Sequence, residues 1–114
     1  MKKINLRAEF DSIEKYWTQK IVGEANGSLL KLAKGIGEIN WHKHDDQDEV
    51  FMVYKGNLTI RLKDEEDITL HEGELFIVPK GVEHAPKADS EVELLVMGIN
   101  VTSNEEGGKP EWSY

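Results

Sequence analysis

Two histidines and a glutamate stand close together in the stretch Trp41-His42-Lys43-His44-Asp45-Asp46-Gln47-Asp48-Glu49. One residue separates His42 from His44, so in an extended segment both imidazoles point to the same face. Glu49 opens an apolar run that predicts a strand, and the acidic residues before it predict a turn. A carboxylate on the neighbouring arm of such a hairpin can reach the same ion as the two imidazoles. The stretch therefore predicts a group of metal-ligating side chains.

A third histidine ends a second window, which runs Gly73-Glu74-Leu75-Phe76-Ile77-Val78-Pro79-Lys80-Gly81-Val82-Glu83-His84. Pro79 and Gly81 predict a turn after a short apolar strand. Taken alone, His84 is best interpreted as an ordinary hydrogen-bonding residue, but after a His-x-His pair it is a candidate third nitrogen ligand. The fourth histidine, His71, has no such partners and is expected to face solvent.

Short apolar runs between turn signals fill most of the remaining chain. Asn26-Gly27 lies between two such runs and is a strong hairpin signal, because both residues tolerate the positive φ of a tight turn. The last run is apolar on both faces, as in a strand that is buried on both sides or faces a partner chain. Regularly spaced strands without an internal helix predict an all-β sandwich or barrel. The expected strands span 21–22, 29–33, 49–54, 58–63, 68–70, 75–78 and 93–101.

The length of 114 residues corresponds to one domain. We expect an N-terminal arm or short helix over residues 1–17 and the β-barrel over residues 18–102. A tail rich in Glu, Gly, Lys and Pro follows over residues 103–114.

The composition argues against several classes of protein. The chain has 14 Lys+Arg against 22 Asp+Glu, a formal net charge of −8, and no basic stripe, so we expect no nucleic-acid binding. Cysteine is absent, which removes thiolate metal sites and cysteine nucleophiles. No apolar stretch approaches the ~20 residues of a membrane span, and the N-terminus carries no secretory signal. We therefore expect a cytoplasmic protein without membrane contact.

The two histidine windows resemble the two sequence motifs of the cupin superfamily. The first motif is matched by His42-x-His44-x4-Glu49-x6-Gly56, although its leading glycine falls between Gly35 and Gly37. The second motif is matched by Gly73-x5-Pro79-x-Gly81-x2-His84, and its final Asn is replaced by Ala88. The chain is most similar to small single-domain cupins of the type-2, mannose-6-phosphate isomerase-like kind.

This resemblance implies an all-β fold, a double-stranded β-helix or jelly-roll barrel, with one divalent metal ion inside it. The implied metal ligands are His42, His44, Glu49 and His84. Asp48 is an alternative to Glu49, but the spacing to Gly56 favours Glu49. Nitrogen and oxygen ligands of this kind suit Fe, Mn, Ni or Zn, and also Co or Cu.

The resemblance leaves two functions open. One is a metal-dependent enzyme, of isomerase or dioxygenase type, that acts on a small polar metabolite. The alternative is a non-catalytic cupin that binds or senses a small molecule. Phe51 and Val53 share the face of Glu49 and are candidates to line the pocket, together with Met97. These candidates are apolar, and the sequence indicates no general base.

A homodimer is expected from two features of the sequence. The last strand offers a second apolar face, and the N-terminal arm carries the aromatic residues Phe10, Tyr16 and Trp17. Both provide surface that a second copy of the chain can bury.

Overall fold

The computed structural model describes residues 1–101 and shows an antiparallel β fold, as the sequence predicts. The helix α1 spans Leu6–Asp11 and lies within the expected arm. The expected tail over 103–114 lies outside the described residues. No helix in residues 1–101 has the length and apolar character needed to span a membrane. The strands of the described residues are β1 (Lys20–Ala25), β2 (Ser28–Glu38), β3 (Glu49–Lys55), β4 (Leu58–Leu62), β5 (Ile68–Leu70), β6 (Leu75–Val78) and β7 (His84–Gly98).

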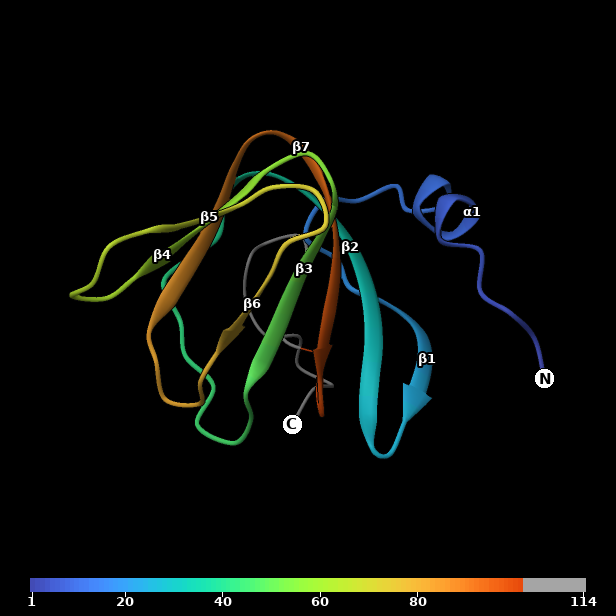
Figure 1. The fold of residues 1–114 in the computed structure, drawn as a ribbon, viewed down its shortest axis with the longest axis horizontal. Coiled ribbons are helices and arrows are strands. Elements are labelled where there is room, and N and C mark those ends of the chain that lie inside the picture. The colour runs from blue at the N-terminus through green and yellow to red at the C-terminus, as the bar shows by residue number, and fades with distance from the viewer. Residues whose placement is uncertain (102–114) are drawn as a thin grey trace.

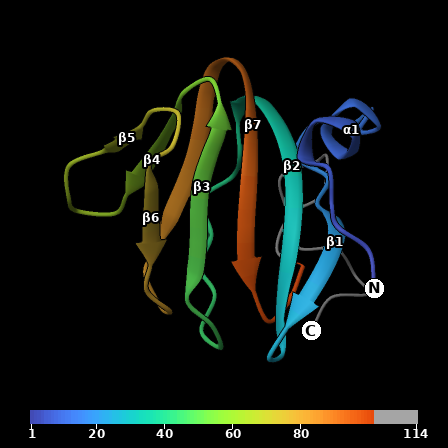
Figure 2. The same ribbon diagram turned by 45° about the vertical axis from the view of Figure 1, so that its right-hand side comes forward.

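The two halves of the fold meet on β7. Along its first half this strand pairs with β4, and along its second half it lies between β2 and β3. The strand order is β1-β2-β7-β3-β6, and β5 adds to β4. Figure 1 shows β4 and β5 at the opposite side of the molecule from β1. Figure 2 shows the long strands side by side, with α1 beyond β2.

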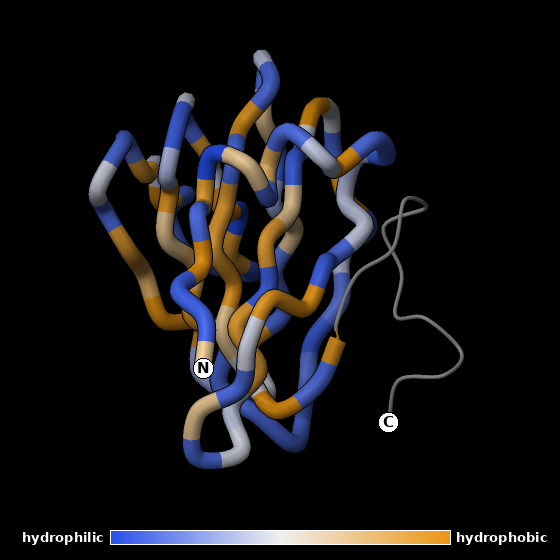
Figure 3. Tube along the Cα trace, turned by 90° about the vertical axis from the view of Figure 1, so that its right-hand side faces the viewer, coloured by the Kyte–Doolittle hydropathy of each residue, from blue (hydrophilic) through white to orange (hydrophobic). Residues whose placement is uncertain are grey.

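Period-2 alternation places one face of each strand in the core. In β4, Leu58, Ile60 and Leu62 are buried, whereas Arg61 between them is half-buried. Hydrophobic and hydrophilic positions are interleaved along the strands in Figure 3. The Asn26-Gly27 hairpin joins β1 to β2 as predicted, with φ of 53° and 82° at its two residues. The predicted all-β class is therefore confirmed.

The last strand is longer than the sequence indicates. It begins at His84 rather than near Glu93, and it ends at Gly98. Its first half contains the polar residues Lys87 and Asp89, so a search for apolar runs does not detect a strand there. This half pairs with β4 and with the end of β2, so backbone hydrogen bonds rather than side-chain hydrophobicity define it.

The helix α1 is anchored to the outer face of the sheet. Asn5 caps its N-terminus by accepting a hydrogen bond from the Ala8 amide at 3.0 Å. Arg7 forms a two-point ion pair with the buried carboxylate of Glu93 on β7. Phe10 is fully buried and stacks on Tyr54, with ring centroids 5.1 Å apart. Part of the outer sheet face is thus covered from within the chain.

Trp17 is also buried, and the reason lies at Gly35 in β2. The Trp17 ring lies on the glycine backbone, and a Cβ at position 35 would come within 2.8 Å of ring atom Cζ2. The indole N–H donates to the Ile36 carbonyl at 3.0 Å. The expectation that Phe10 and Trp17 offer surface to a second copy is therefore wrong, since both are buried within one chain.

Gly35→Ala should destabilise the fold by about 1–3 kcal/mol, because the added methyl group overpacks the Trp17 site. Urea unfolding monitored by tryptophan fluorescence measures this loss. Gly23→Ala in β1 is the matched control, because its Cβ would meet nothing closer than the Ile4 Cδ1 atom at 3.4 Å. Equal stability of the two variants would contradict the packing described for Trp17.

Candidate metal centre

Four side chains from separate parts of the sequence meet inside the barrel. His42 and His44 lie in the connection between β2 and β3, Glu49 begins β3, and His84 begins β7. Each offers one ligand atom, and these atoms all lie within 4.8 Å of one another. His42 and His84 form an isolated β-bridge, with backbone N–O distances of 3.0 and 2.8 Å. The four residues that the sequence singles out are brought together.

The imidazoles are oriented by backbone carbonyl groups. The Nδ1 atom of His42 lies 2.6 Å from the Asn40 oxygen, and that of His84 lies 2.8 Å from the Val82 oxygen. A carbonyl oxygen only accepts, so each Nδ1 carries the proton. The Nε2 atom of each neutral ring then keeps its lone pair. Such backbone contacts are typical of histidines that bind metals through the other nitrogen.

The lone pairs of the imidazole Nε2 atoms point towards a carboxylate oxygen rather than towards hydrogen-bond donors. The Nε2 atoms of His84 and His44 lie 3.3 and 3.6 Å from the same Glu49 carboxylate oxygen. The His44 Nε2 atom is buried and has no hydrogen-bond partner among residues 1–101. Burial lowers the pKa of His42, which favours its neutral form near pH 7. Nitrogen and oxygen acceptors that face each other in a buried site fit a cation between them.

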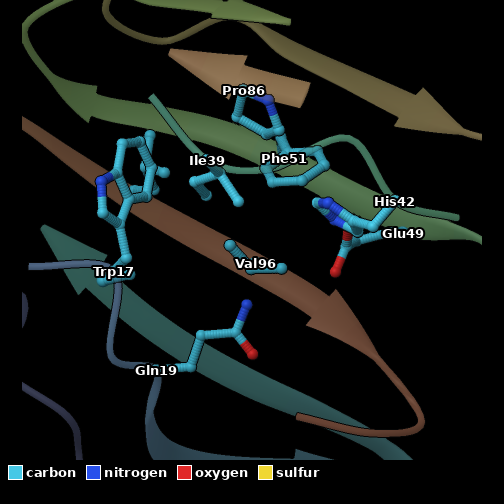
Figure 4. A pocket seen from close by; sticks show the side chains of 10 residues that line it. Trp17, Gln19, Ile39, His42, Glu49, Phe51, Pro86 and Val96 are labelled. Atoms are coloured by element: carbon cyan, nitrogen blue, oxygen red, sulfur yellow. The ribbon is translucent and has the colours of Figure 1, made fainter. Parts of the chain in front are cut away.

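A small cavity of about 10 Å³ adjoins these ligands, with room for about one water molecule. Figure 4 shows His42 and Glu49 at one side of it and Trp17 at the other. Apolar side chains form most of the wall. The lining residues are Trp17, Gln19, Ala33, Ile39, His42, Glu49, Phe51, Pro86, Leu94 and Val96.

The other predicted site residues lie in different places. Phe51 lines the cavity, and its ring centroid lies 6.2 Å from that of His84. Val53 is fully buried in the apolar core and is not among the lining residues. Met97 pairs with Val50 on the outer face of the sheet and borders a separate groove. Asp48 is exposed and accepts a hydrogen bond from the Lys80 amide at 2.9 Å, so it lies outside the cluster.

Sequence reasoning missed Lys31, whose side chain is fully buried in β2. Its ammonium group donates to the Asn100 carbonyl oxygen. Burial lowers the pKa of Lys31 to about 8, and the negative charge of Glu49 partly opposes this change. The alternation of residues 29–33 could have indicated its position, because it places Lys31 on the strand face opposite to Leu30 and Leu32.

The free energy of unfolding should rise with pH between about 8 and 10.5, because unfolded Lys31 still holds a proton there and folded Lys31 has lost it. This contribution is up to about 3 kcal/mol. Lys31→Met should remove it, whereas Lys34→Met, half-buried and three residues along β2, should keep it. Urea unfolding at several pH values measures the effect. The same pH dependence in Lys31→Met and wild type would show that Lys31 is not the group responsible.

A family model and a solved structure identify the family of this chain. The family model described as "Cupin domain" matches residues 28–99, a region that contains the four clustered side chains. The chain is 33% identical over 84 residues to the protein YdbB of Bacillus subtilis (strain 168). The aligned region covers 74% of each chain. A cupin-2 domain containing protein from Shewanella frigidimarina NCIMB 400 has 40% identity and a TM-score of 0.80, with coverage of 82% of this chain and 91% of that one.

Protein NMB1881 from Neisseria meningitidis has 30% identity and a TM-score of 0.79. That match covers 85% of this chain and 98% of the Neisseria chain. The likeness therefore extends over almost the whole of the solved structure and well beyond the histidine motifs. The chain belongs to the cupin superfamily, as a small cupin-domain protein.

Proposed function

We propose that His42, His44, Glu49 and His84 bind one divalent transition metal ion. The observation that carries this proposal is the convergence of ring nitrogens and a carboxylate oxygen, lone pair towards lone pair, in a buried site. Neutral imidazoles and one carboxylate suit Fe, Mn, Ni or Zn. When bound, such an ion supplies Lewis-acid or redox chemistry to a small molecule that binds beside it.

The ligand that we propose for this centre is a small polar metabolite. A polar group of this ligand binds at the metal end of the cavity, and the apolar wall around Phe51 and Val96 excludes water from it. An enzyme built on this site would catalyse an isomerase- or dioxygenase-type reaction, with the metal ion held by His42, His44, Glu49 and His84.

The alternative is a non-catalytic cupin that binds or senses its small molecule. The composition of the wall favours this alternative. Apart from the proposed ligands, Gln19 and the Trp17 indole supply the polar groups of the described lining residues, and neither is a general acid or base near neutral pH. Oxygen-uptake and isomerase assays on metal-loaded protein separate the two functions.

His44→Ala should lose the bound metal and keep the fold. Elemental analysis of protein purified without a histidine tag should show near-stoichiometric Fe, Mn, Ni or Zn in wild type and little in the variant. His71→Ala is the matched control, because His71 is exposed and hydrogen-bonds Asn57 at 2.7 Å, away from the cluster. Stoichiometric metal retained in His44→Ala would refute the ligand assignment.

We also propose that the chain forms a homodimer through the outer face of the sheet. Two rows of apolar side chains cross the strands on this face, and no charged residue interrupts them. Leu75 and Ile77 on the edge strand β6 are 57% and 50% exposed. The rows, read from the strand register, are Leu75–Met52–Leu95 and Ile77–Val50–Met97–Leu30; Leu32, which follows Leu95 in the first row, is fully buried.

A second copy is the partner that this face fits best. The two uncharged rows are self-complementary under a two-fold axis, because neither copy has to bury an unpaired charge against them. The helix α1 contacts β2, pairs with Glu93 of β7 and stacks on Tyr54, so it covers that part of the face. The uncovered part continues to the edge strand, where exposed apolar residues otherwise invite unspecific association.

Leu75→Glu should convert the dimer into a monomer, since it places a carboxylate in the apolar interface. Light scattering coupled to gel filtration at about 10 μM protein measures the mass. Ile21→Glu is the control: Ile21 is 46% exposed, but it pairs with Lys31 and so lies on the other face of the sheet. A monomeric wild-type protein under these conditions would contradict the proposed dimer.

A further inference from the structure

Lys31 and Glu49 are the fully buried charged groups that face the barrel interior in residues 1–101. The other fully buried carboxylate, Glu93, is paired with Arg7 on the outer face. Lys31 pairs with Val96 in the strand register, and Val96 in turn pairs with Phe51. Glu49 lies two residues before Phe51 on the same face of β3. The two charges therefore lie on the same inner surface, separated by one strand.

The Lys31 side chain leans towards the metal end of this surface. Its ammonium group reaches the carbonyl oxygen of Asn100, which follows the end of β7. The same end of β7 is held to the ligand-bearing connection, because the Ile99 amide donates to Gln47 Oε1 at 2.7 Å. The negative charge of Glu49 acts on this ammonium group. The positive charge is thus directed towards the site where the metal would bind.

The ammonium group retains hydrogen-bonding capacity. It has three N–H bonds, and within residues 1–101 the Asn100 carbonyl is its described acceptor. A carbonyl acceptor satisfies one N–H bond of the buried ammonium group and supplies no negative charge. A further acceptor, and an anionic one above all, would stabilise it.

Metal binding changes the charge balance of the interior. Before it, the carboxylate of Glu49 offsets the ammonium group of Lys31. A divalent ion then adds two positive charges, while the three imidazoles stay neutral. The loaded centre carries one more positive charge than the same ligand set would carry without Lys31. In a medium of low dielectric constant this excess is costly unless an anion binds.

We propose that Lys31 makes the metal centre select an anionic ligand, a carboxylate or an enolate, over a neutral one of the same shape. This inference rests on the proposed metal function and names the class of its small-molecule ligand. The anion binds the metal and is stabilised by the nearby ammonium group. The cavity beside the proposed metal ligands is small and its wall is largely apolar, so the wall itself discriminates little between an anionic and a neutral ligand.

The test uses Co²⁺-loaded protein and two probes of equal size, formate and formamide. Visible absorption of the Co²⁺ centre reports the binding of each probe. We expect wild-type protein to prefer formate, and Lys31→Met to reduce the formate-to-formamide affinity ratio about tenfold or more. Lys34→Met, from the same strand, should keep the wild-type ratio. Lys31→Gln provides a second neutral variant, and circular dichroism confirms the fold of each.

The possible outcomes distinguish failure of the Lys31 inference from failure of the proposed metal binding. Wild-type protein that binds no Co²⁺ overturns the metal function and this inference with it. Stoichiometric Co²⁺ in all variants, with an unchanged affinity ratio in both Lys31 variants, overturns the role of Lys31 and leaves the metal centre standing. A ratio that falls in Lys31→Met and Lys31→Gln but not in Lys34→Met supports the selection of an anion by Lys31.

Discussion

The candidate metal centre depends on the short backbone bridge between His42 and His84. Its two hydrogen bonds, of 3.0 and 2.8 Å, fasten an otherwise irregular connection to the first residue of β7. A third hydrogen bond, from the Gly81 amide to the His44 carbonyl at 2.7 Å, fixes the same connection two residues after His42. With both backbones held, the rings of His42 and His84 lie 4.4 Å apart and face Glu49. Side chains on a free loop would not hold three lone pairs towards one point, because each would rotate to water.

The polar groups of the candidate site lower the stability of the fold relative to an all-apolar interior. The buried carboxylate of Glu49 and the unpartnered Nε2 atom of His44 each cost free energy that an apolar side chain would not. Lys31 offsets part of the cost through its opposite charge, and it introduces a buried charge of its own. The pair is tolerable because the surrounding strands pack a continuous apolar core. Sites of function are where such departures from an all-apolar interior concentrate.

The sequence shows the parts of this design that have a local signature. Alternating apolar runs predict the inward faces of β3 and β4, Asn26-Gly27 predicts the hairpin, and motif spacing predicts the clustered His42, His44, Glu49 and His84. Features that depend on contacts distant in sequence were missed. The first half of β7 is polar and is a strand because β4 and β2 pair with it. Trp17 is buried because Gly35 has no side chain, and Lys31 points inward because of its register with Val96.

The inner site and the outer face are built from the same two strands. Glu49 and Phe51 of β3 point inward, whereas Val50 and Met52 point to the outer face. In β7, Leu94 and Val96 line the cavity, while Leu95 and Met97 belong to the outer rows. A strand of period 2 cannot shift its register for one face without moving the other. A partner packed on the outer face would therefore also restrain the positions of Glu49 and Phe51. The proposed dimer and the candidate metal centre would then be coupled through the backbone of β3.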